Sequence, residues 1–121
     1  MKILLAENDV FFQKMYAVRL QKEGFEVNTA SDGEETLIKV REWHPTLILL
    51  DLIMPKKDGF QVLQELSQDS VLKQIPVLVF STLSQAEDIE KAKKLGATDY
   101  IDKGSIAFDE LLRKIRPFIP S

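Results

Sequence analysis

Short apolar runs alternate with longer amphipathic stretches along this chain. The apolar runs have the length and branched composition of buried strands, and they predict strands at Lys2–Ala6, Glu26–Thr29, Leu47–Leu50, Val77–Phe80 and Asp99–Ile101. Between them, apolar residues recur at helical spacing, as at Phe12, Met15, Tyr16 and Leu20, and Gly24 is suited to end that helix. Strands that alternate with helices predict a parallel sheet covered on both faces.

This alternation favours an open, doubly wound α/β sheet over a closed barrel. A barrel would need eight strand–helix units and about twice this length. Right-handed crossovers between parallel strands leave few arrangements of the remaining units.

Two Ser-x-x-Glu segments have the pattern of a capping box, which marks the first turn of a helix. Ser31 would cap a helix that ends near Trp43, and Ser84 would cap a helix that ends at Gly96. The second of these helices would bury an apolar face made of Ala86, Ile89, Ala92 and Leu95.

The remaining helices carry weaker signals. A shorter helix is predicted over Gly59–Ser67, and Ser105 is predicted to cap the last helix. Pro117 lies inside that last helical pattern, so we expect the helix to end or bend near Ile115.

Composition narrows the class of protein. The 121 residues, 45% of them hydrophobic, predict one domain over 1–121 with no effector domain. The chain has no cysteine and no apolar run long enough to span a membrane, so we expect a cytoplasmic protein without disulfides. A net charge of −3 argues against direct binding to nucleic acid.

Asp51 lies at the end of the most apolar predicted strand. Pro55 cannot continue a central strand, so the chain leaves the sheet just after this carboxylate. Ligands of open α/β sheets bind at the carboxyl edge of the strands, and a carboxylate beside apolar surface requires a cation or a hydrogen-bond donor. Asp51 is therefore the first candidate for a functional residue.

Other polar side chains follow the neighbouring predicted strands. The first strand is followed by Glu7-Asn8-Asp9, the fourth by Ser81-Thr82 and the fifth by Lys103. Because the carboxyl ends of parallel strands share one edge, acids, a hydroxyl group and an ammonium group should meet there. Oxygen ligands for Mg²⁺, a carboxylate nucleophile and phosphate-binding donors together suit phosphoryl transfer.

These residues also resemble a known family. Asp51 with Met54-Pro55, Asp58-Gly59, Ser81-Thr82, and Tyr100 before Lys103 follow the order and spacing of the response-regulator receiver domains of two-component signalling. The chain is similar to the chemotaxis response regulator along almost its whole length. The resemblance implies a flavodoxin-like (βα)5 fold with strand order 2-1-3-4-5.

The resemblance also implies a mechanism. Asp51 would take a phosphoryl group from a histidine kinase or a histidine phosphotransfer protein, with Lys103 and Ser81 as the other catalytic residues. Mg²⁺ would be held by Glu7, Asn8, Asp51 and the backbone carbonyl of Ile53, with Asp9 as a further candidate. The domain would be a signalling switch and not a turnover enzyme.

The switch itself would involve Ser81 and Tyr100. The resemblance implies that Ser81 turns to the phosphate, that Tyr100 turns inward, and that the face formed by the fourth helix, fifth strand and fifth helix then changes its affinity for a downstream effector. The domain would be a monomer or a phosphorylation-dependent dimer.

Four positions bear on how this site works. Asn8 stands where the family usually has a metal-binding carboxylate, which lowers the negative charge of the site, and Asp9 either reaches inward or caps the first helix. In this family, positions matching Ile53 and Leu83 control water access to the phosphate. Both are apolar here, so we expect slow loss of the phosphate.

Other functions remain as alternatives. A pseudo-receiver, which binds partners without phosphorylation, is favoured by Asn8 and opposed by Asp51, Ser81 and Lys103. Phosphatases with an aspartate nucleophile have Asp-x-Asp after the first strand, whereas here Asp51 follows the third and precedes Leu52-Ile53. Nucleotide binding is disfavoured because no glycine-rich loop follows the first strand.

Overall fold

The computed structural model describes residues 1–119. Its strands are β1 (Lys2–Ala6), β2 (Glu26–Ala30), β3 (Leu47–Leu50), β4 (Val77–Ser81) and β5 (Asp99–Asp102). Its helices are α1 (Val10–Lys22), α2 (Gly33–Trp43), α3 (Gly59–Ser67), α4 (Ala86–Lys94) and α5 (Phe108–Ile115), with 3₁₀ turns η1 (Leu72–Gln74) and η2 (Arg116–Phe118). The predicted alternation of strands and helices is confirmed.

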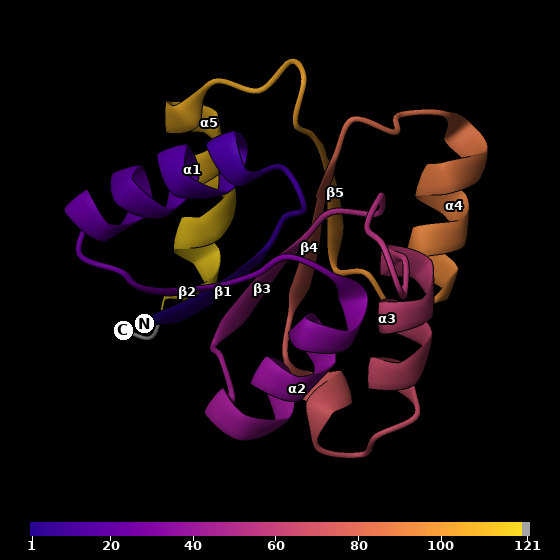
Figure 1. Cartoon of the computed structure of the whole chain (residues 1–121). Helices are drawn as coiled ribbons and strands as arrows, with labels where there is room; N and C mark the ends of the chain where they lie inside the picture. The colour runs from indigo at the N-terminus through magenta and orange to yellow at the C-terminus, as the bar shows by residue number, and fades with distance from the viewer. Residues whose placement is uncertain (120–121) are drawn as a thin grey trace.

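The strands form one parallel sheet in the order β2-β1-β3-β4-β5 (Figure 1). The expected doubly wound, flavodoxin-like fold is therefore confirmed. Three strands run one residue beyond their predicted ends, because Ala30 pairs with Ala6 and Ser81 pairs with Asp102. All five strands point the same way, so their carboxyl ends lie along one edge of the sheet.

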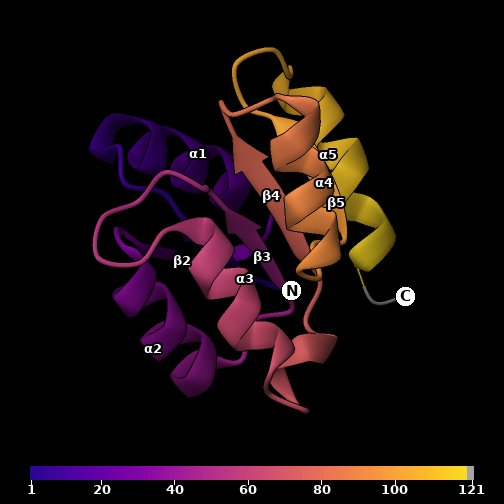
Figure 2. The ribbon, with the colours of Figure 1, turned by 90° about the vertical axis from the view of Figure 1, so that its right-hand side faces the viewer.

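Two layers of helices cover the two faces of the sheet (Figures 1 and 2). The layer of α1 and α5 packs on one face, where Ile3 and Leu5 meet Tyr16, Leu20 and Leu111. The layer of α2, α3 and α4 packs on the other face, against a core that contains Leu4, Ala6, Leu37, Val62 and Ala92. Successive residues of β1 thus enter opposite cores, as strand geometry requires.

Three helices begin on aspartate side chains. Asp9, Asp32 and Asp58 accept hydrogen bonds from backbone N–H groups in the first turns of α1, α2 and α3. At α3, Gln61 completes a capping box with Asp58. These contacts satisfy donors that the helix itself leaves unpaired.

The three predicted serine caps are wrong. Asp32 caps α2 in place of Ser31, because the backbone N–H of Glu35 lies 2.8 Å from the carboxylate of Asp32. α4 begins after Gln85 rather than Ser84, and α5 begins after Ala107 rather than Ser105, neither with a side-chain cap. Because α4 begins so late, Ala86 is exposed instead of buried, while Ala92 lies in the core as predicted.

The later part of the chain follows the other predictions. α5 ends at Ile115 and continues as the 3₁₀ turn η2, which contains Pro117. The predicted helix over Gly59–Ser67 is α3. None of the helices within residues 1–119 is long and apolar enough to cross a membrane.

Gly59 brings α3 close to the end of β3. Its N–H donates to the carbonyl of Leu52 at 3.0 Å, and a Cβ added at Gly59 would lie 2.5 Å from the carbonyl oxygen of Asp51. Such a contact is too short for any side chain. The glycine therefore allows α3 to pack directly against the turn that carries Asp51.

Candidate functional site

A buried lysine joins two carboxylates at the carboxyl edge of the sheet. The ammonium group of Lys103 donates to Glu7 Oε2 at 2.7 Å and to Asp51 Oδ2 at 3.1 Å. All three residues are buried. Because buried charges are costly unless they are paired, this shared cation is what makes two neighbouring carboxylates compatible with the core.

The backbone places these three residues just beyond the strand ends. The N–H of Glu7 donates to Ala30 at 2.9 Å, and the N–H of Asp51 donates to Ala6 at 3.0 Å. The N–H of Lys103 donates to the carbonyl of Ser81 at 2.9 Å. Each residue is therefore held by the hydrogen bond that continues the parallel ladder, and the site forms where the predicted topology required it.

Backbone donors hold the other oxygen of each carboxylate. Glu7 Oε1 accepts from the N–H of Asp9 at 3.0 Å, and Asp51 Oδ1 accepts from the N–H of Ile53 at 3.2 Å. Both carboxyl groups thus have donors on both sides. Glu7 and Asp51 are consequently fixed in orientation.

Burial and the neighbouring charges both shift the pKa values of Glu7 and Lys103. Burial raises the pKa of Glu7, and the nearby charge of Asp51 adds to this, against the opposing hydrogen bond from Lys103. Burial by itself would lower the pKa of Lys103, but its hydrogen bond to Glu7 and the charge of Asp51 raise it overall. Lys103 therefore remains a cation at neutral pH.

Ser81 ends β4, Tyr100 lies within the neighbouring β5, and both hydrogen-bond to one loop residue. The fully buried Ser81 accepts a hydrogen bond at its Oγ from the N–H of Leu83 at 3.3 Å. The half-buried Tyr100 donates its hydroxyl to the carbonyl of Leu83, and burial raises its pKa to about 12. The two residues predicted to act as a switch are thus both bound to the backbone of Leu83.

Asn8 and Asp9 lie outside the buried cluster. Both are exposed, and Asp9 accepts from the N–H of Phe12 at 3.1 Å as the N-cap of α1. The sequence left two roles open for Asp9, and in the structure Asp9 caps α1. Its carboxylate is engaged in holding the first turn of α1.

The donor set fits Mg²⁺ in its chemistry. The carboxylates of Glu7 and Asp51, the amide of Asn8 and the backbone carbonyl of Ile53 are hard oxygen ligands of the kind that Mg²⁺ binds. Within residues 1–119, however, no three side chains of Asp, Glu, His or Cys are gathered as a metal cluster. A metal here would depend on two carboxylates that Lys103 already partly neutralises.

One aromatic neighbour of the site was not predicted to have a role there. The ammonium nitrogen of Lys103 lies 5.1 Å from the centre of the Phe12 ring. The sequence pattern placed Phe12 on the buried face of α1, where it does lie, but hydrophobic spacing carries no information about a cation on the neighbouring loop.

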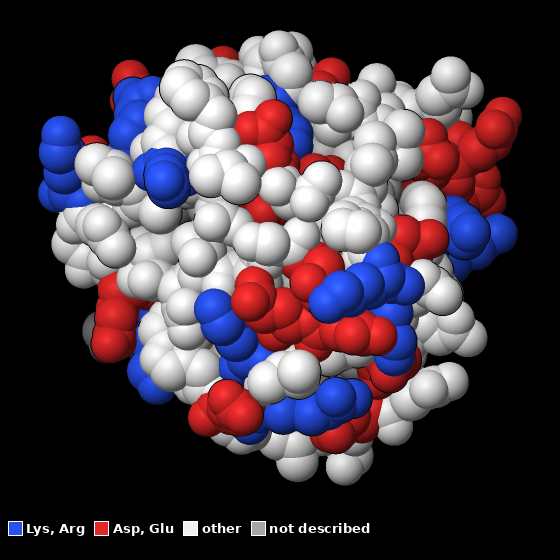
Figure 3. All heavy atoms as spheres, viewed as in Figure 1, with Lys and Arg blue, Asp and Glu red and all other residues white. Residues whose placement is uncertain are grey.

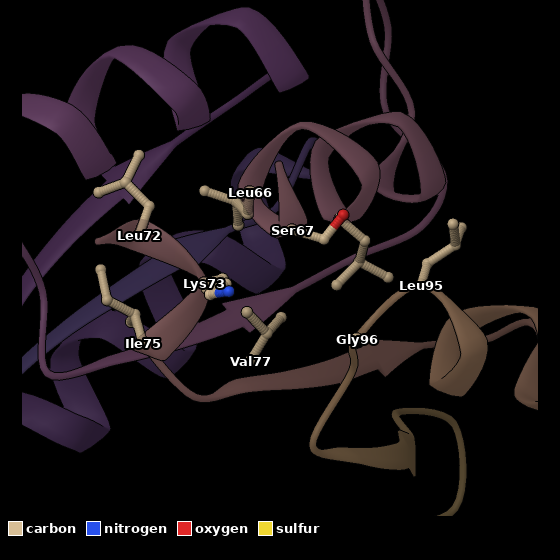
Figure 4. Close-up of a pocket in the computed structure, with 9 residues that line it drawn as sticks. Leu66, Ser67, Leu72, Lys73, Ile75, Val77, Leu95 and Gly96 are labelled. Carbon is tan, nitrogen blue, oxygen red and sulfur yellow. The ribbon is translucent and has the colours of Figure 1, made fainter. Parts of the chain in front are cut away.

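A small pocket beside the start of β4 does not resemble a catalytic or ligand-binding site (Figure 4). It has a volume of about 50 Å³ and lies between α3, η1, the start of β4 and the turn after α4. Its lining is mostly aliphatic, as Leu66, Leu72, Ile75 and Val77 show. A volume close to that of one or two water molecules has no room for a substrate.

The face of the molecule in Figure 3 has no broad area of a single charge sign. Figure 3 shows acidic and basic side chains interspersed over the face that it presents. Ion pairs between exposed or half-exposed groups account for part of this mixture, such as Lys57 with Glu65 at 2.5 Å and Lys94 with Glu90 at 3.1 Å. Charge alone therefore singles out no partner on this face.

Comparison with known proteins identifies a family for the chain. Residues 3–116 match the family model described as "Response regulator receiver domain". Among curated relatives, "Probable transcriptional regulator ycf27" of Cyanophora paradoxa is 39% identical over 102 residues, covering 84% of this chain and 41% of that protein. Protein PilG of Pseudomonas aeruginosa is 30% identical, covering 100% of this chain and 89% of PilG. The chain thus spans about two fifths of the length of the ycf27 protein.

Solved structures give the same result. Chemotaxis protein CheY4 of Vibrio cholerae superimposes with a TM-score of 0.89 at 29% identity, covering 98% of each chain. The BeF3-activated N-terminal receiver domain of Klebsiella pneumoniae RstA superimposes with a TM-score of 0.90 at 26% identity, covering 100% of each chain. From the site geometry, the family model and these neighbours, we conclude that the chain belongs to the family of response regulator receiver domains.

Proposed function

We propose that this domain accepts a phosphoryl group on Asp51 from a phosphohistidine of a kinase or phosphotransfer protein. The observation that supports this most is the bridge from Lys103 to Asp51 and Glu7 at the edge of the sheet. It places a nucleophilic carboxylate beside a cation that can neutralise an incoming phosphoryl group.

The chemistry is a single displacement at phosphorus. An oxygen of Asp51 forms the new P–O bond as the P–N bond of the phosphohistidine breaks, and the electron pair leaves with the imidazole nitrogen. Lys103 would then pair with a phosphoryl oxygen. The Oγ of Ser81 accepts from Leu83, which leaves its O–H free to donate to another oxygen. Bound Mg²⁺ would supply further positive charge on the phosphoryl oxygens.

We propose a switch rather than a turnover enzyme, since the group transferred stays on the protein. Tyr100 and Ser81 both bind Leu83, so movement of Ser81 toward the phosphate would disturb the loop that leads into α4. The face of α4, β5 and α5 would then change its preference for an effector. A relative is named as a transcriptional regulator, which favours an output in transcription.

The mass of the intact protein tests the proposal. Acetyl phosphate with Mg²⁺ should add one phosphate to the wild type and none to Asp51→Asn. Asp58→Asn is the matched control, because asparagine also caps helices and Asp58 lies outside the cluster. An unmodified wild type, beside a known receiver that reacts, would refute phosphorylation.

A titration with Mg²⁺ tests the role of Asn8. Asn8→Asp adds a carboxylate at the rim of the site, so calorimetry should show tighter binding of Mg²⁺. Asp9→Asn keeps a capping side chain and should leave the affinity unchanged. If instead Asp9→Asn weakens binding, Asp9 belongs to the metal site and the exposed position described above is not the one it holds with metal.

Asn8 also favours a second candidate function, the pseudo-receiver. Such a domain would bind its partner equally well with and without acetyl phosphate. A partner whose affinity is the same for the wild type and for Asp51→Asn, before and after treatment, would support it. A difference that only the wild type shows would support the switch.

The apolar residues around the phosphate should set how long it lasts. Ile53 is 54% exposed and Leu83 is half-buried, and neither can hydrogen-bond to an attacking water through its side chain. Slow decay is therefore expected after acetyl phosphate is removed. Ile53→Asn or Leu83→Glu should speed the decay, and rapid loss that neither variant alters would exclude this role.

We infer that the donor docks on exposed apolar residues near the site. Val10, Phe11 and Ile53 are 57%, 74% and 54% exposed and belong to the segments that follow Glu7 and Asp51. Phe11→Ser should therefore slow transfer from a phosphohistidine protein while transfer from acetyl phosphate stays unchanged. Equal slowing with both donors would show that the substitution damages the site and not the docking of the partner.

A further inference from the structure

The Phe12 ring is a third neighbour of the Lys103 ammonium, beside the carboxylates of Glu7 and Asp51. Two of the three N–H groups of the ammonium donate to Glu7 and Asp51, and the Phe12 ring centre lies 5.1 Å from the nitrogen. This distance is within the range of a cation–π contact. We propose that Phe12 is a positioning residue that holds Lys103 for phosphoryl transfer, an inference that rests on the function proposed above.

The Phe12 ring is held in place from two directions. Its backbone N–H donates to the capping carboxylate of Asp9 at 3.1 Å, which fixes the first turn of α1. Its ring stacks on Tyr16 with centres 5.8 Å apart and planes 10° apart, and Tyr16 meets Phe80 edge-on at 5.1 Å. These contacts hold the Phe12 ring in one position beside Lys103.

The fixed position of the Phe12 ring matters because Lys103 must change partners during the reaction. The ammonium now pairs with Glu7 and Asp51, and it would have to reach a phosphoryl oxygen as charge develops there. The Lys103 side chain is only 6% exposed. An aromatic face keeps water from the ammonium and attracts it at the same time, whereas an aliphatic side chain only excludes water.

The neighbouring phenylalanine shows that the position is specific. Phe11 is 74% exposed, while Phe12 is half-buried against the core that contains Tyr16 and Phe80. Phe108 belongs to the same aromatic group, at 6.3 Å from Tyr16, but its ring faces Arg19 at 4.0 Å rather than Lys103. The chain therefore provides a matched control for loss of a ring from this core.

Three variants separate positioning from packing. Phe12→Leu keeps an apolar side chain without the ring, Phe12→Tyr keeps the ring, and Phe108→Leu removes a different ring from the same core. With acetyl phosphate and saturating Mg²⁺, we expect Phe12→Leu to lower the maximal phosphorylation rate about tenfold, at an unchanged half-saturating donor concentration. Phe12→Tyr and Phe108→Leu should stay within about twofold of the wild type.

A rate for Phe12→Leu equal to the wild type would overturn the proposal, and so would equal slowing in Phe108→Leu or failure of Phe12→Tyr to restore the rate. Proton NMR of the Lys103 side chain gives a readout that needs no phosphorylation. The ring should shift the Hε signals upfield in the wild type and in Phe12→Tyr, and not in Phe12→Leu. An unphosphorylated wild type that still shows this shift would refute the proposed function alone, and absence of the shift would refute the contact.

Discussion

The helices of the first half of the chain begin on aspartate side chains, and those of the second half do not. Asp9, Asp32 and Asp58 cap α1, α2 and α3, whereas Gln85 and Ala107 precede α4 and α5 without a side-chain hydrogen bond. An aspartate cap typically contributes about 1 kcal/mol. The first half is thus anchored at every helix start, whereas α4 and α5 lack this contribution.

The two halves also differ in packing, because α4 buries fewer residues than α3. Ala92 is the one residue of α4 that is buried among those described, while α3 of equal length buries Gly59, Val62, Leu63 and Leu66. Figure 2 shows α4 on the outside, beside α3 and α5. Glu7 and Asp51 belong to the anchored half and Ser81 to the other, so the proposed site lies across the boundary. We expect the conformational change to be taken up mainly by α4.

Gly59→Ala should have the largest effect of these substitutions, because its added Cβ would meet backbone atoms next to Asp51. The added Cβ would lie 2.5 Å from the carbonyl oxygen of Asp51 and must displace backbone. We expect a loss of about 3 kcal/mol in the free energy of unfolding, measured with urea, and slower phosphorylation. Gly104→Ala is the control, since its Cβ would come no nearer than 3.3 Å to another group. Similar losses in both would contradict the close-packing argument.

Asp58→Ala removes the strongest cap of the anchored half. It breaks both hydrogen bonds of the capping box with Gln61, at 2.9 Å each. The free energy of unfolding should fall by about 1–2 kcal/mol, whereas Gln85→Ala should change it by less than about 0.5 kcal/mol. If the two substitutions lower the free energy of unfolding equally, helix capping does not distinguish the two halves of the chain.

Tyr100→Phe tests what holds the second half. Loss of the hydroxyl bond to Leu83 should cost about 1 kcal/mol at pH 7. Burial raises the pKa of Tyr100 to about 12. The stabilisation is therefore complete below the unfolded pKa of about 10 and is lost as the pH rises toward 12.

The wild type and Tyr100→Phe should consequently differ most at neutral pH and converge in alkali. Urea unfolding at several pH values between 7 and 12 checks this. A constant difference over that range would mean that the phenol is not what links Tyr100 to Leu83.

Gln85→Asp should give the smallest change, in the opposite direction. It supplies α4 with the kind of cap that α1, α2 and α3 have, and we expect a gain of about 0.5 kcal/mol. If α4 takes up the conformational change, amide NMR should show smaller shifts over α4 on phosphorylation than in the wild type. Unchanged shifts together with a gain in stability would place the movement elsewhere.

The central strands could be predicted because burial on both faces leaves a strong signal, whereas the strand order was implied by the family resemblance. Leu47–Leu50 is apolar throughout, and each strand end is followed by a turn or a polar residue. Exact ends could not be predicted, since Ala30 and Ser81 join the sheet only through partners on other strands. The meeting of Glu7, Asp51 and Lys103 followed from topology and resemblance together.

The caps and the aromatic neighbour could not be predicted in the same way. Ser31 and Asp32 are adjacent and both are good caps, and the choice depends on where the chain leaves β2. Ser84 and Ser105 have the right composition, but their loops start the helices later. Phe12 has the spacing of a core residue, and only the fold brings it to Lys103.

The bridge from Lys103 to Glu7 joins residues 96 positions apart, so it has a consequence for synthesis on the ribosome. Glu7 and Asp51 leave the ribosome well before Lys103, and until then no ammonium is available to separate the two carboxylates. A nascent or prematurely ended chain would have to bury two like charges, which opposes closure of the sheet. The residue that would stabilise the phosphate thus also completes the buried charge cluster, and a chain that stops short of Lys103 should be exposed to proteases.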